Sequence, residues 1–489
     1  MKILFYYRDS ENIGIEYLSA VLKRKGHKTE LIYKTGTGSK FGMVHFKGFK
    51  KLDEDKKLIQ KAKRFSPDLL AFGCETDLYQ DTLQMAKKLK AIFNVPSILG
   101  GKHATNLPEE VIKEDCFDML CRGEGEDAII EVVNNLEEGK NVSKIKNIWG
   151  KQGKKIIRNE VRPLIQDLDK LPFPDRSLFH QYNAFGTQLM VIGSRGCPYS
   201  CSYCNNSYYK NLYKGKGKYI RRRSIDNIIA EIKDAIPKYK IKTVQFEDEN
   251  FLVDVGWVKE FSEKYKKGVG LPFWCQANPN NITKEKIAYL KDAGCKEIFM
   301  GLESGNKKIR EEVYNRYTTN EQIIKSASII KGTGILMQST AIFGAPDETP
   351  KEMWDTIRLI EKIRPDAIPT YTLYPYYNTN VFEYAKKKGY LDEEIIEKIK
   401  NGEQGSHGRN LLKHPYKNMG YNISKLLSLY VRSPKLIKPF IRRWMDNKER
   451  HFVDYAYIFL LPFDNPFVGR EKIKIFFKNL FKEYTINRE

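Results

Sequence analysis

Apolar residues along the first 150 positions form short continuous runs that alternate with helically spaced segments. The run MKILFYY predicts a strand, and Ile15, Leu18, Val21 and Leu22 recur at the spacing of one helical face. Further strands are expected at PDLLAFGC and VPSILGG, with a helix at DTLQMAKKLKAIF between them. This alternation is typical of a doubly wound parallel sheet, whose ligands bind at the carboxyl ends of its strands. We therefore expect a Rossmann-like α/β domain over residues 1–150.

A second series of strand and helix patterns begins near residue 189. The expected strands are LMVIGS, TVQFEDENF, FWCQAN, EIFMGLESG and MQSTAIFGAP, and the clearest helices are TKEKIAYLKDAG and NEQIIKSASIIKGTG. Several of these strands end in acidic or small polar residues. In barrels of strand and helix units, binding groups collect at such carboxyl ends. From about residue 381 onward we recognise no motif, and we expect a mainly helical carboxy-terminal region over 381–489.

Length and composition favour a soluble, cytoplasmic protein of two or three domains. The chain has 489 residues and eight cysteines without the regular spacing of a secreted disulfide framework. Arg8, Asp9 and Glu11 follow too soon after the first apolar residues for a signal peptide. The longest apolar run, YAYIFLLPF at 455–463, is far shorter than the roughly 20 residues that cross a bilayer.

The formal net charge of +23 raises the question of an anionic partner. Through residue 400 the excess of lysine is spread out, which favours solvated surface charge over nucleic-acid binding. The last 89 residues hold 17 Lys or Arg against 8 Asp or Glu, interleaved with aromatic residues. This density indicates an anionic partner of some kind for the carboxy-terminal region.

Three cysteines lie close together in GSRGCPYSCSYCNN, residues 193–206. Structural zinc needs four nitrogen or sulfur ligands, and no fourth Cys or His lies nearby in the sequence. Iron–sulfur clusters are also held by cysteine thiolates, usually four. A loop with three would leave one iron with a free coordination position, where a substrate can bind.

The spacing Cys197-x3-Cys201-x2-Cys204, with Gly196, Pro198 and Tyr203 around it, resembles the signature of radical S-adenosylmethionine (SAM) enzymes. The resemblance implies a 4Fe-4S cluster held by the three cysteines, with SAM chelating the fourth iron. It also implies an external electron donor of the flavodoxin or ferredoxin type and release of a 5'-deoxyadenosyl radical. The implied fold for residues 151–380 is a partial (β/α)6 TIM-type barrel.

The same resemblance implies contacts to SAM along the barrel strands. Glu303, in the GLESG segment, and Ser339 match positions that face SAM, and Tyr203 lies in the cysteine loop. Glu247, Asp248 and Glu249 lie where the family meets the methionine amino group. Each of these acids alone could instead cap a helix or form a surface ion pair, and it is their order along the chain that favours the cofactor role.

The first domain resembles the cobalamin-binding domain that precedes the barrel in many radical SAM enzymes. The resemblance rests on three loops: DSENIG after the first strand, the double glycine at 100–101, and CRGEGE at 121–126. The residues in these loops that are expected to contact cobalamin are Glu11, Gly14, Gly100, Gly101, Gly123 and Glu124. Domains that supply an axial imidazole have His in the first loop, where this chain has Glu11. Since carboxylate is a poor ligand for low-valent cobalt, we expect cobalamin without a protein histidine beneath it.

The sequence leaves two alternatives open for this domain. It could be an ordinary flavodoxin-like domain whose glycines only form turns. It could also be the domain of a methylthiotransferase, which holds a second cluster. However, Cys74, Cys116 and Cys121 do not fit the cysteine spacing of that second cluster.

Three further residues are candidates for a catalytic role. Where relatives often have Pro-x-Pro-Gly-Thr late in the barrel, this chain has Tyr376 and Tyr377 followed by Asn378. The two phenols are candidates for substrate contact, proton handling or simple packing. Cys275 lies on an expected barrel strand and could donate a hydrogen atom, although a buried cysteine usually packs as a small hydrophobic group.

The combined resemblance is to the class B radical SAM methyltransferases, and it implies a cobalamin-dependent C-methyltransferase acting on an unactivated carbon of a small-molecule, lipid or peptide substrate. The alternative within enzymes is a rearrangement, cyclisation or C–C coupling. A hypothesis of another class is an RNA- or membrane-binding protein with a vestigial enzyme core, although the intact cysteine loop argues against it.

For the tail at 432–452 we expect a short helix from about residue 439. It could lie on an anionic membrane, grip a charged substrate, or pack its apolar side on the barrel.

Overall fold

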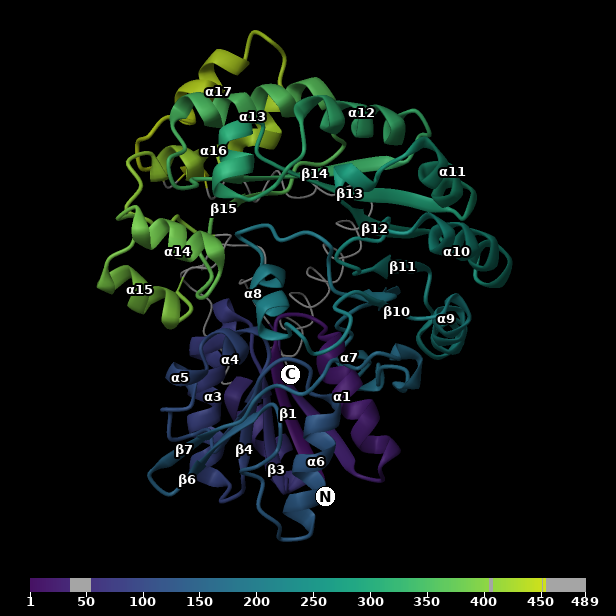
Figure 1. Ribbon diagram of the computed structural model, residues 1–489, viewed down its shortest axis with the longest axis vertical. Coiled ribbons are helices and arrows are strands. Elements are labelled where there is room, and N and C mark those ends of the chain that lie inside the picture. The colour runs from purple at the N-terminus through teal and green to yellow at the C-terminus, as the bar shows by residue number, and fades with distance from the viewer. Residues whose placement is uncertain (36–53, 404–407, 451, 454–489) are drawn as a thin grey trace, which may run out of the picture.

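The computed structural model describes residues 1–35, 54–403, 408–450 and 452–453. It contains two large sheets, one in an amino-terminal domain and one in a barrel that lies above that domain in Figure 1. The predicted Rossmann-like domain and partial barrel are present, and the described part of the predicted carboxy-terminal region is mainly helical. The apolar run at 455–463 lies outside the described residues.

The amino-terminal sheet has the strand order β2-β1-β3-β4-β5-β6-β7, and its first five strands are parallel. The strands are β1 (Lys2–Arg8), β2 (Lys28–Lys34), β3 (Leu69–Gly73), β4 (Ser97–Gly100), β5 (Met119–Cys121), β6 (Ile148–Gln152) and β7 (Lys155–Arg158). The helices are α1 (Ile13–Arg24), α2 (Glu54–Phe65), α3 (Tyr79–Ile92), α4 (Lys102–Asn106), α5 (Pro108–Val111) and α6 (Glu126–Glu137). The antiparallel strands β6 and β7 continue the sheet past residue 150.

The order of the first strands explains where a ligand can bind. The connections leave β1 toward β2 on one side and reach β3 on the other, so the sheet has a switch point at β1 and β3. The loop after β1 lies at this point, and Asn12 within it caps α1, accepting a hydrogen bond from the Ile15 amide at 3.0 Å. The crevice at these strand ends is therefore the expected ligand site of the domain.

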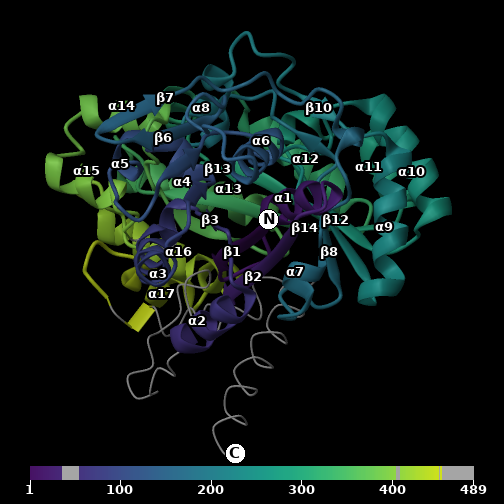
Figure 2. The ribbon, with the colours of Figure 1, turned by 90° about the horizontal axis from the view of Figure 1, so that it is seen from below.

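The barrel is an open sheet of six parallel strands in the order β15-β14-β13-β12-β11-β8. The strands are β8 (Gln188–Val191), β11 (Thr243–Phe246), β12 (Phe273–Ala277), β13 (Cys295–Glu303), β14 (Leu336–Phe343) and β15 (Thr370–Thr372). The helices that follow these strands are α9 (Ile225–Tyr239), α10 (Val255–Gly268), α11 (Lys284–Asp292), α12 (Asn320–Lys331) and α13 (Pro350–Ile363). Seen from below, α9, α10 and α11 stand along one side of the barrel, opposite α14 and α15 (Figure 2).

The remaining elements connect or cover the two large sheets. They are α7 (Ser177–His180), β9 (Ser194–Arg195), α8 (Asn205–Leu212), β10 (Arg221–Arg222), α14 (Asn380–Lys387), α15 (Glu393–Lys400), α16 (Lys417–Arg432) and α17 (Lys438–Trp444). The last of these is the short helix expected near residue 439. No helix in the described part of the chain is both long and apolar enough to cross a membrane.

Helix α8 lies between the two domains (Figure 1) and contacts the amino-terminal one directly. Its Asn205 accepts a hydrogen bond from Asn106 at 2.8 Å, and its Tyr208 hydroxyl donates to the Thr105 carbonyl at 3.2 Å. From the far end of the barrel, the Asn378 amide donates to the Asn106 carbonyl at 2.7 Å. The cysteine loop, which leads directly into α8, is thereby placed at the domain junction.

One acid in the barrel wall generates a pH-dependent contribution to stability. Glu297 on β13 is 1% exposed. One oxygen of its carboxyl group accepts a hydrogen bond from the Gln338 amide at 2.6 Å, and the other oxygen has no hydrogen-bond partner among the described residues. Burial raises the pKa of this carboxyl to about 7. Because the folded protein holds the proton more tightly than the unfolded chain, the stabilisation is present at low pH and is lost as the pH rises through about 7.

We expect Glu297→Gln to remove this pH dependence, because the neutral amide keeps the shape and never ionises. Thermal unfolding of both proteins between about pH 5 and 8 should show the wild type losing on the order of 2 kcal/mol relative to the variant. Parallel curves for the two proteins would contradict the assignment of a buried, protonated Glu297.

Candidate active site

A cavity of about 1020 Å³ lies between the amino-terminal domain and the open side of the barrel. Its walls come from the loops after β1, β3, β4 and β5, from α8 and from the strand ends of the barrel. The predicted site residues that line it are Glu11, Gly14, Gly100, Gly101, Gly123, Glu124 and Glu247. The two domains therefore share one site.

Two of the loop glycines cannot be replaced without moving their surroundings. Gly101 has a φ of +101°, and a Cβ there would lie 2.5 Å from the Cys74 carbonyl oxygen. Gly123 has a φ of +74°, and its Cβ would lie 1.8 Å from the hydroxyl of Tyr213. These glycines let the loops after β4 and β5 pass close to β3 and α8, which shapes the cavity wall.

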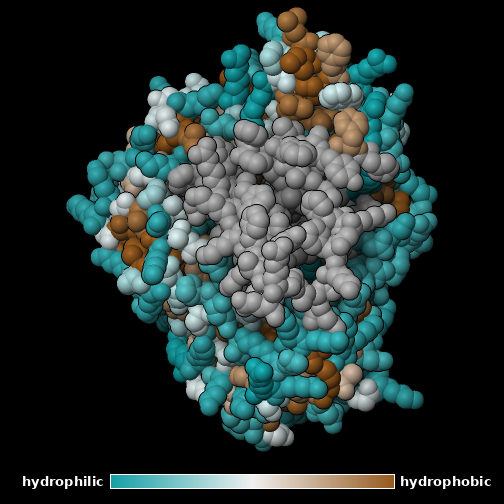
Figure 3. Space-filling model, turned by 180° about the vertical axis from the view of Figure 1, so that it is seen from behind, coloured by the Kyte–Doolittle hydropathy of each residue, from teal (hydrophilic) through white to brown (hydrophobic). Residues whose placement is uncertain are grey.

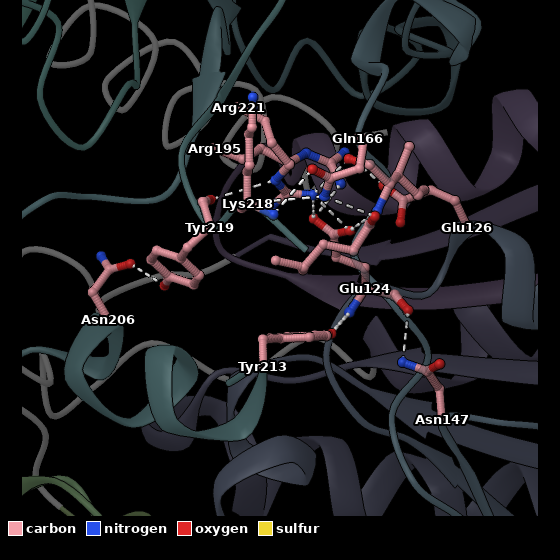
Figure 4. A network of polar contacts seen from close by, with 12 residues as sticks. Glu124, Glu126, Asn147, Gln166, Arg195, Asn206, Tyr213, Lys218, Tyr219 and Arg221 are labelled. Atoms are coloured by element: carbon pink, nitrogen blue, oxygen red, sulfur yellow. Dashed lines mark hydrogen bonds and ion pairs between the residues drawn. The ribbon is translucent and has the colours of Figure 1, made fainter. Parts of the chain in front are cut away.

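Glu124 is held by cations from the barrel, as Figure 4 shows. Arg195 and Arg221, on the short β9–β10 ribbon, approach its carboxylate at 3.1 and 2.8 Å, and Arg195 also contacts Glu126 at 2.6 Å. The backbone amide of Glu124 donates to the Tyr213 hydroxyl at 2.7 Å. The loop that carries Gly123 and Glu124 is thus fixed to the barrel by charge-assisted hydrogen bonds.

Glu11 belongs to a second buried ion-pair network across the junction. It is 8% exposed and contacts Arg176 at 3.0 Å, and the same guanidinium contacts Glu16 at 2.7 Å and Glu231 of α9 at 2.8 Å. Burial raises the pKa of Glu16 well above its usual range, and the neighbouring Glu11 acts in the same direction. The carboxyl of Glu11 therefore lines the cavity in a fixed position.

The three loop cysteines have surroundings that suit an iron–sulfur cluster. Arg316 places a guanidinium nitrogen 3.7 Å from the Cys201 sulfur, and the Asn206 amide lies 3.7 Å from the Cys204 sulfur. Cys204 directly precedes α8, whose N-terminus favours a thiolate. Burial raises the pKa of the Cys197 thiol to about 12 and that of the Cys204 thiol to about 11.

Within the described residues, no three His, Cys, Asp or Glu side chains are grouped to hold a single metal ion. The three thiolates of a 4Fe-4S cluster each bind a different iron, so they need not converge on a single metal ion. Hydrogen-bond donors beside the sulfurs fit the negative charge of such a cluster. The donor set therefore fits 4Fe-4S.

Two of the three consecutive acids after β11 reach the cavity. Glu247 and Glu249 line it, and Gln276 donates to Glu247 at 2.9 Å. Asp248 points the other way, where it accepts hydrogen bonds from the Gly193 amide at 3.0 Å and from the Ser194 hydroxyl. Burial raises the pKa of Asp248 to about 6. This placement favours Asp248 as a support of the strand that leads into the cysteine loop.

Glu303 ends β13 and Ser339 lies on β14, and neither residue lines the cavity. Glu303 has a φ of 68° at an irregularity between β13 and β14 and lies near Arg316, whose pKa it raises. Ser339 is fully buried, and its hydroxyl has no hydrogen-bond partner among the described residues. An orphaned buried hydroxyl is expected where a ligand completes the site.

The remaining candidates are packed against neighbouring rings or in the core. Tyr203 stacks edge-on against Tyr314 at 5.1 Å. Tyr376 and Tyr377 contact other rings, Tyr374 and Phe382, each at 4.8 Å between ring centres. Cys275 is fully buried in the hydrophobic core. Neither Tyr376, Tyr377 nor Cys275 lines the cavity, and these positions favour the packing roles that the sequence left open.

The three other cysteines that were considered for a second cluster are all buried. Cys74 and Cys116 belong to one hydrophobic cluster of the first domain, and Cys121 belongs to the cluster on the opposite face of the sheet. They cannot converge on one group without unfolding the sheet.

Sequence reasoning missed the basic and amide residues around the site: Asn206, Arg176, Arg195, Arg221 and Arg316. Asn206 follows the third cysteine by two positions, and this adjacency was a usable signal. Arg195 precedes the first cysteine by two positions and had the same signal, whereas Arg176, Arg221 and Arg316 become part of the site only when distant segments fold together.

We expect Gly123→Ala to weaken cobalamin binding at least about tenfold, because the added methyl group forces the loop away from Tyr213. Binding of cobalamin to the isolated, cluster-free protein checks this. Gly139→Ala is the matched control, since Gly139 also has a positive φ, +67°, but nothing lies within 4 Å of its Cβ position. Equal cobalamin affinity in the two variants would contradict the role of the loop.

Comparison with known proteins agrees with this geometry. The family model for the B12 binding domain matches residues 5–133, and that for the radical SAM superfamily matches residues 191–360. An uncharacterized methyltransferase of Pyrococcus horikoshii is 30% identical over 369 residues, covering 71% of this chain and 79% of the relative.

Two solved structures show the same arrangement of domains. The cobalamin-dependent SAM radical enzyme OxsB, with aqua-cobalamin and SAM bound, matches with a TM-score of 0.67 at 15% identity, covering 98% of this chain and 75% of that one. The methyltransferase TsrM of Kitasatospora setae, with tryptophan and a SAM analogue bound, matches with a TM-score of 0.64 at 16% identity, covering 79% and 76%. On the family matches, the relative and the cysteine loop together, this chain belongs to the radical SAM superfamily and is a member that carries an amino-terminal B12-binding domain.

Proposed function

We propose that the protein is a C-methyltransferase that transfers a methyl group to an unactivated carbon of a small molecule. The observation that carries the proposal is that the walls of one cavity combine the cobalamin-domain loops with the acids of the barrel. Gly196 and Asn206, which flank the cysteines, also line it. The name of the Pyrococcus horikoshii relative and the tryptophan bound to TsrM support a methyl transfer to a small molecule.

The residues of the chain divide into three sets by the group that each would hold. Cys197, Cys201 and Cys204 would hold the 4Fe-4S cluster. Tyr203, Glu247, Glu303 and Ser339 would surround SAM, with Asp248 supporting the strand that leads into the cysteine loop. Glu11, Gly14, Gly100, Gly101, Gly123 and Glu124 would surround cobalamin. When bound, these groups supply a 5'-deoxyadenosyl radical and a transferable methyl group.

The protein itself would position the bound groups and present charged side chains to them. Glu247 and Glu249 present carboxylates that suit an ammonium group, and Arg316, between Glu303 and Cys201, presents a cation that suits a carboxylate. Glu11 is restrained by Arg176 and occupies the place where an imidazole would otherwise stand. Tyr376 and Tyr377, which are half-buried, stay candidates for a catalytic role. Cys275 is fully buried and stays a candidate only if substrate binding exposes its thiol.

Electrons would come from an external flavodoxin or ferredoxin, since no second cluster site is formed by the described cysteines. A thiolate-held cluster also favours a reducing compartment, and we place the protein in the cytoplasm on that ground.

Two other functions make different predictions. A rearrangement, cyclisation or C–C coupling would use the same cavity and radical without methyl transfer, and the description of OxsB as a radical enzyme leaves room for it. An RNA- or membrane-binding protein with a vestigial core would need neither cluster nor SAM cleavage.

Methyl transfer is tested with the reconstituted, anaerobic protein, cobalamin, a reductant and SAM labelled at its methyl group, supplied with small-molecule fractions of cell extract. We expect label on a carbon of one product, formed together with 5'-deoxyadenosine. Substrate-dependent 5'-deoxyadenosine without label in the product would favour the alternative reaction, and no SAM cleavage at all would contradict both.

Changing any loop cysteine to alanine, for example Cys201→Ala, should abolish both the absorbance of the 4Fe-4S cluster and reductive SAM cleavage. With three ligands there is no spare thiolate. Cys116→Ala, a change at a buried cysteine of the other domain, is the control and should keep both signals. Full cleavage activity in Cys201→Ala would overturn the assignment of the cluster.

A further inference from the structure

Exposed apolar side chains gather at the carboxy-terminal end of the described chain. Among the described residues eight large apolar side chains are strongly exposed, and five of them lie between residues 436 and 452. These five, called here the carboxy-terminal patch, are Leu436 (86% exposed), Ile437 (48%), Phe440 (67%), Trp444 (40%) and Phe452 (41%). The other three, Ile92, Val255 and Tyr317, lie far from them in the sequence. Single exposed apolar residues need no explanation, but a contiguous group does.

Helix α17 carries apolar residues on two sides, and only one of these sides packs against the rest of the described chain. Ile441 and Met445, one turn apart, are 1% and 0% exposed and pack into the core. Ile437, Phe440 and Trp444 share another face by their spacing, and that face is open. Trp444 and Phe452 contact each other edge to face at 5.5 Å, so the patch continues beyond the helix. Packing on the barrel therefore accounts for Ile441 and Met445 but not for the patch.

The space-filling view from behind shows this arrangement. A brown, apolar region stands at the upper right of Figure 3, at the end of the molecule where Figure 1 places α17, with hydrophilic residues around it. No part of the described chain covers it.

The patch has a basic rim. Residues 432–450 contain seven Lys or Arg and two Asp or Glu. Some of these cations are used by the fold: Lys438 pairs with Glu361, and Arg442 lies 4.3 Å over the ring of Trp354. Lys435, Arg443 and Lys448 are exposed beside the patch. The rim therefore carries a net positive charge that faces outward with the apolar side chains.

We propose that the carboxy-terminal patch docks on a lipid bilayer that contains anionic lipids. Aliphatic and aromatic side chains on one open face, bordered by cations, match a surface whose interior is apolar and whose headgroups are negative. Trp and Phe at such an edge suit the headgroup region. The proposal concerns a surface away from the cavity and holds whatever reaction the cavity supports.

The chemistry of the patch favours lipid over the other partners. A nucleic acid would pair with the cations, but it offers nothing apolar to cover Leu436 and Ile437. A second copy of this chain would bring an identical basic rim against this one, and the like charges would repel. A bilayer satisfies both the apolar and the charged parts.

The test is sedimentation of the reconstituted whole protein with vesicles of phosphatidylcholine containing about one quarter phosphatidylglycerol, compared with phosphatidylcholine alone. We expect binding to the anionic vesicles that weakens as the salt concentration rises. Leu436→Asp combined with Phe440→Asp should lower the affinity at least about tenfold, because two apolar side chains no longer leave water. Ile92→Asp, at an exposed apolar residue of α3, is the matched control and should bind as the wild type does.

The cationic part is tested separately. Lys435→Glu combined with Arg443→Glu should lower vesicle affinity about tenfold or more, whereas Lys63→Glu combined with Arg64→Glu, on α2, should not. All variants change exposed residues, and unchanged cluster absorbance and SAM cleavage verify that they are folded.

Three results would overturn the proposal. The first is no binding to anionic vesicles. The second is that the protein binds RNA but not vesicles, and that the charge reversal abolishes the RNA binding. The third is a dimer in sedimentation velocity that Leu436→Asp with Phe440→Asp dissociates without any effect on vesicles.

Discussion

Buried ion pairs between arginines and carboxylates hold the two domains of this protein together at the site. Arg195 and Arg221 bind Glu124 and Glu126 on one wall of the cavity, and Arg176 binds Glu11, Glu16 and Glu231 on another. Removing one partner of such a pair typically costs about 3–5 kcal/mol, because the other charge is left buried and unpaired. A guanidinium with several donors in a fixed plane also orients what it binds. The geometry of the cavity wall is therefore sensitive to the loss of any one of these contacts.

The same junction brings two kinds of chemistry to one place. The crevice at the switch point of the amino-terminal sheet opens toward the strand ends of the barrel, and α8 fills the corner between them. Because the cysteine loop leads straight into α8, the position of the cluster and the position of the cobalamin-domain loops are set by one helix. Asn206 illustrates the coupling, since it accepts a hydrogen bond from Tyr219 at 2.5 Å and lies beside the Cys204 sulfur.

Much of the site could be predicted because its residues are local in sequence. The cysteines lie within eight positions of one another, and each glycine loop directly follows a strand with a recognisable apolar run. The sequence also identified the three acids after β11, but it did not show which way each side chain points. Side chains alternate across a strand and its extension, so that Glu247 and Glu249 reach the cavity while Asp248 turns to the Gly193 amide. The phenols of Tyr376 and Tyr377 were candidates for substrate contact, proton handling or packing, and their ring contacts with Tyr374 and Phe382 favour packing.

By itself the sequence determined the order of elements, the two domains and the three-cysteine loop that is expected to hold the cluster, because periodicity and motif spacing are properties of neighbouring residues. Only the tertiary structure decided which charges meet. Arg316 lies 115 residues from Cys201 and Arg176 lies 165 residues from Glu11, and no local pattern connects such pairs. It also decided which apolar residues are covered, since Ile441 and Phe440 are adjacent in the chain and alike in hydropathy, yet one is buried and the other faces solvent. Burial and long-range pairing are properties of the folded whole, and they arise only when separate segments compete for the same core.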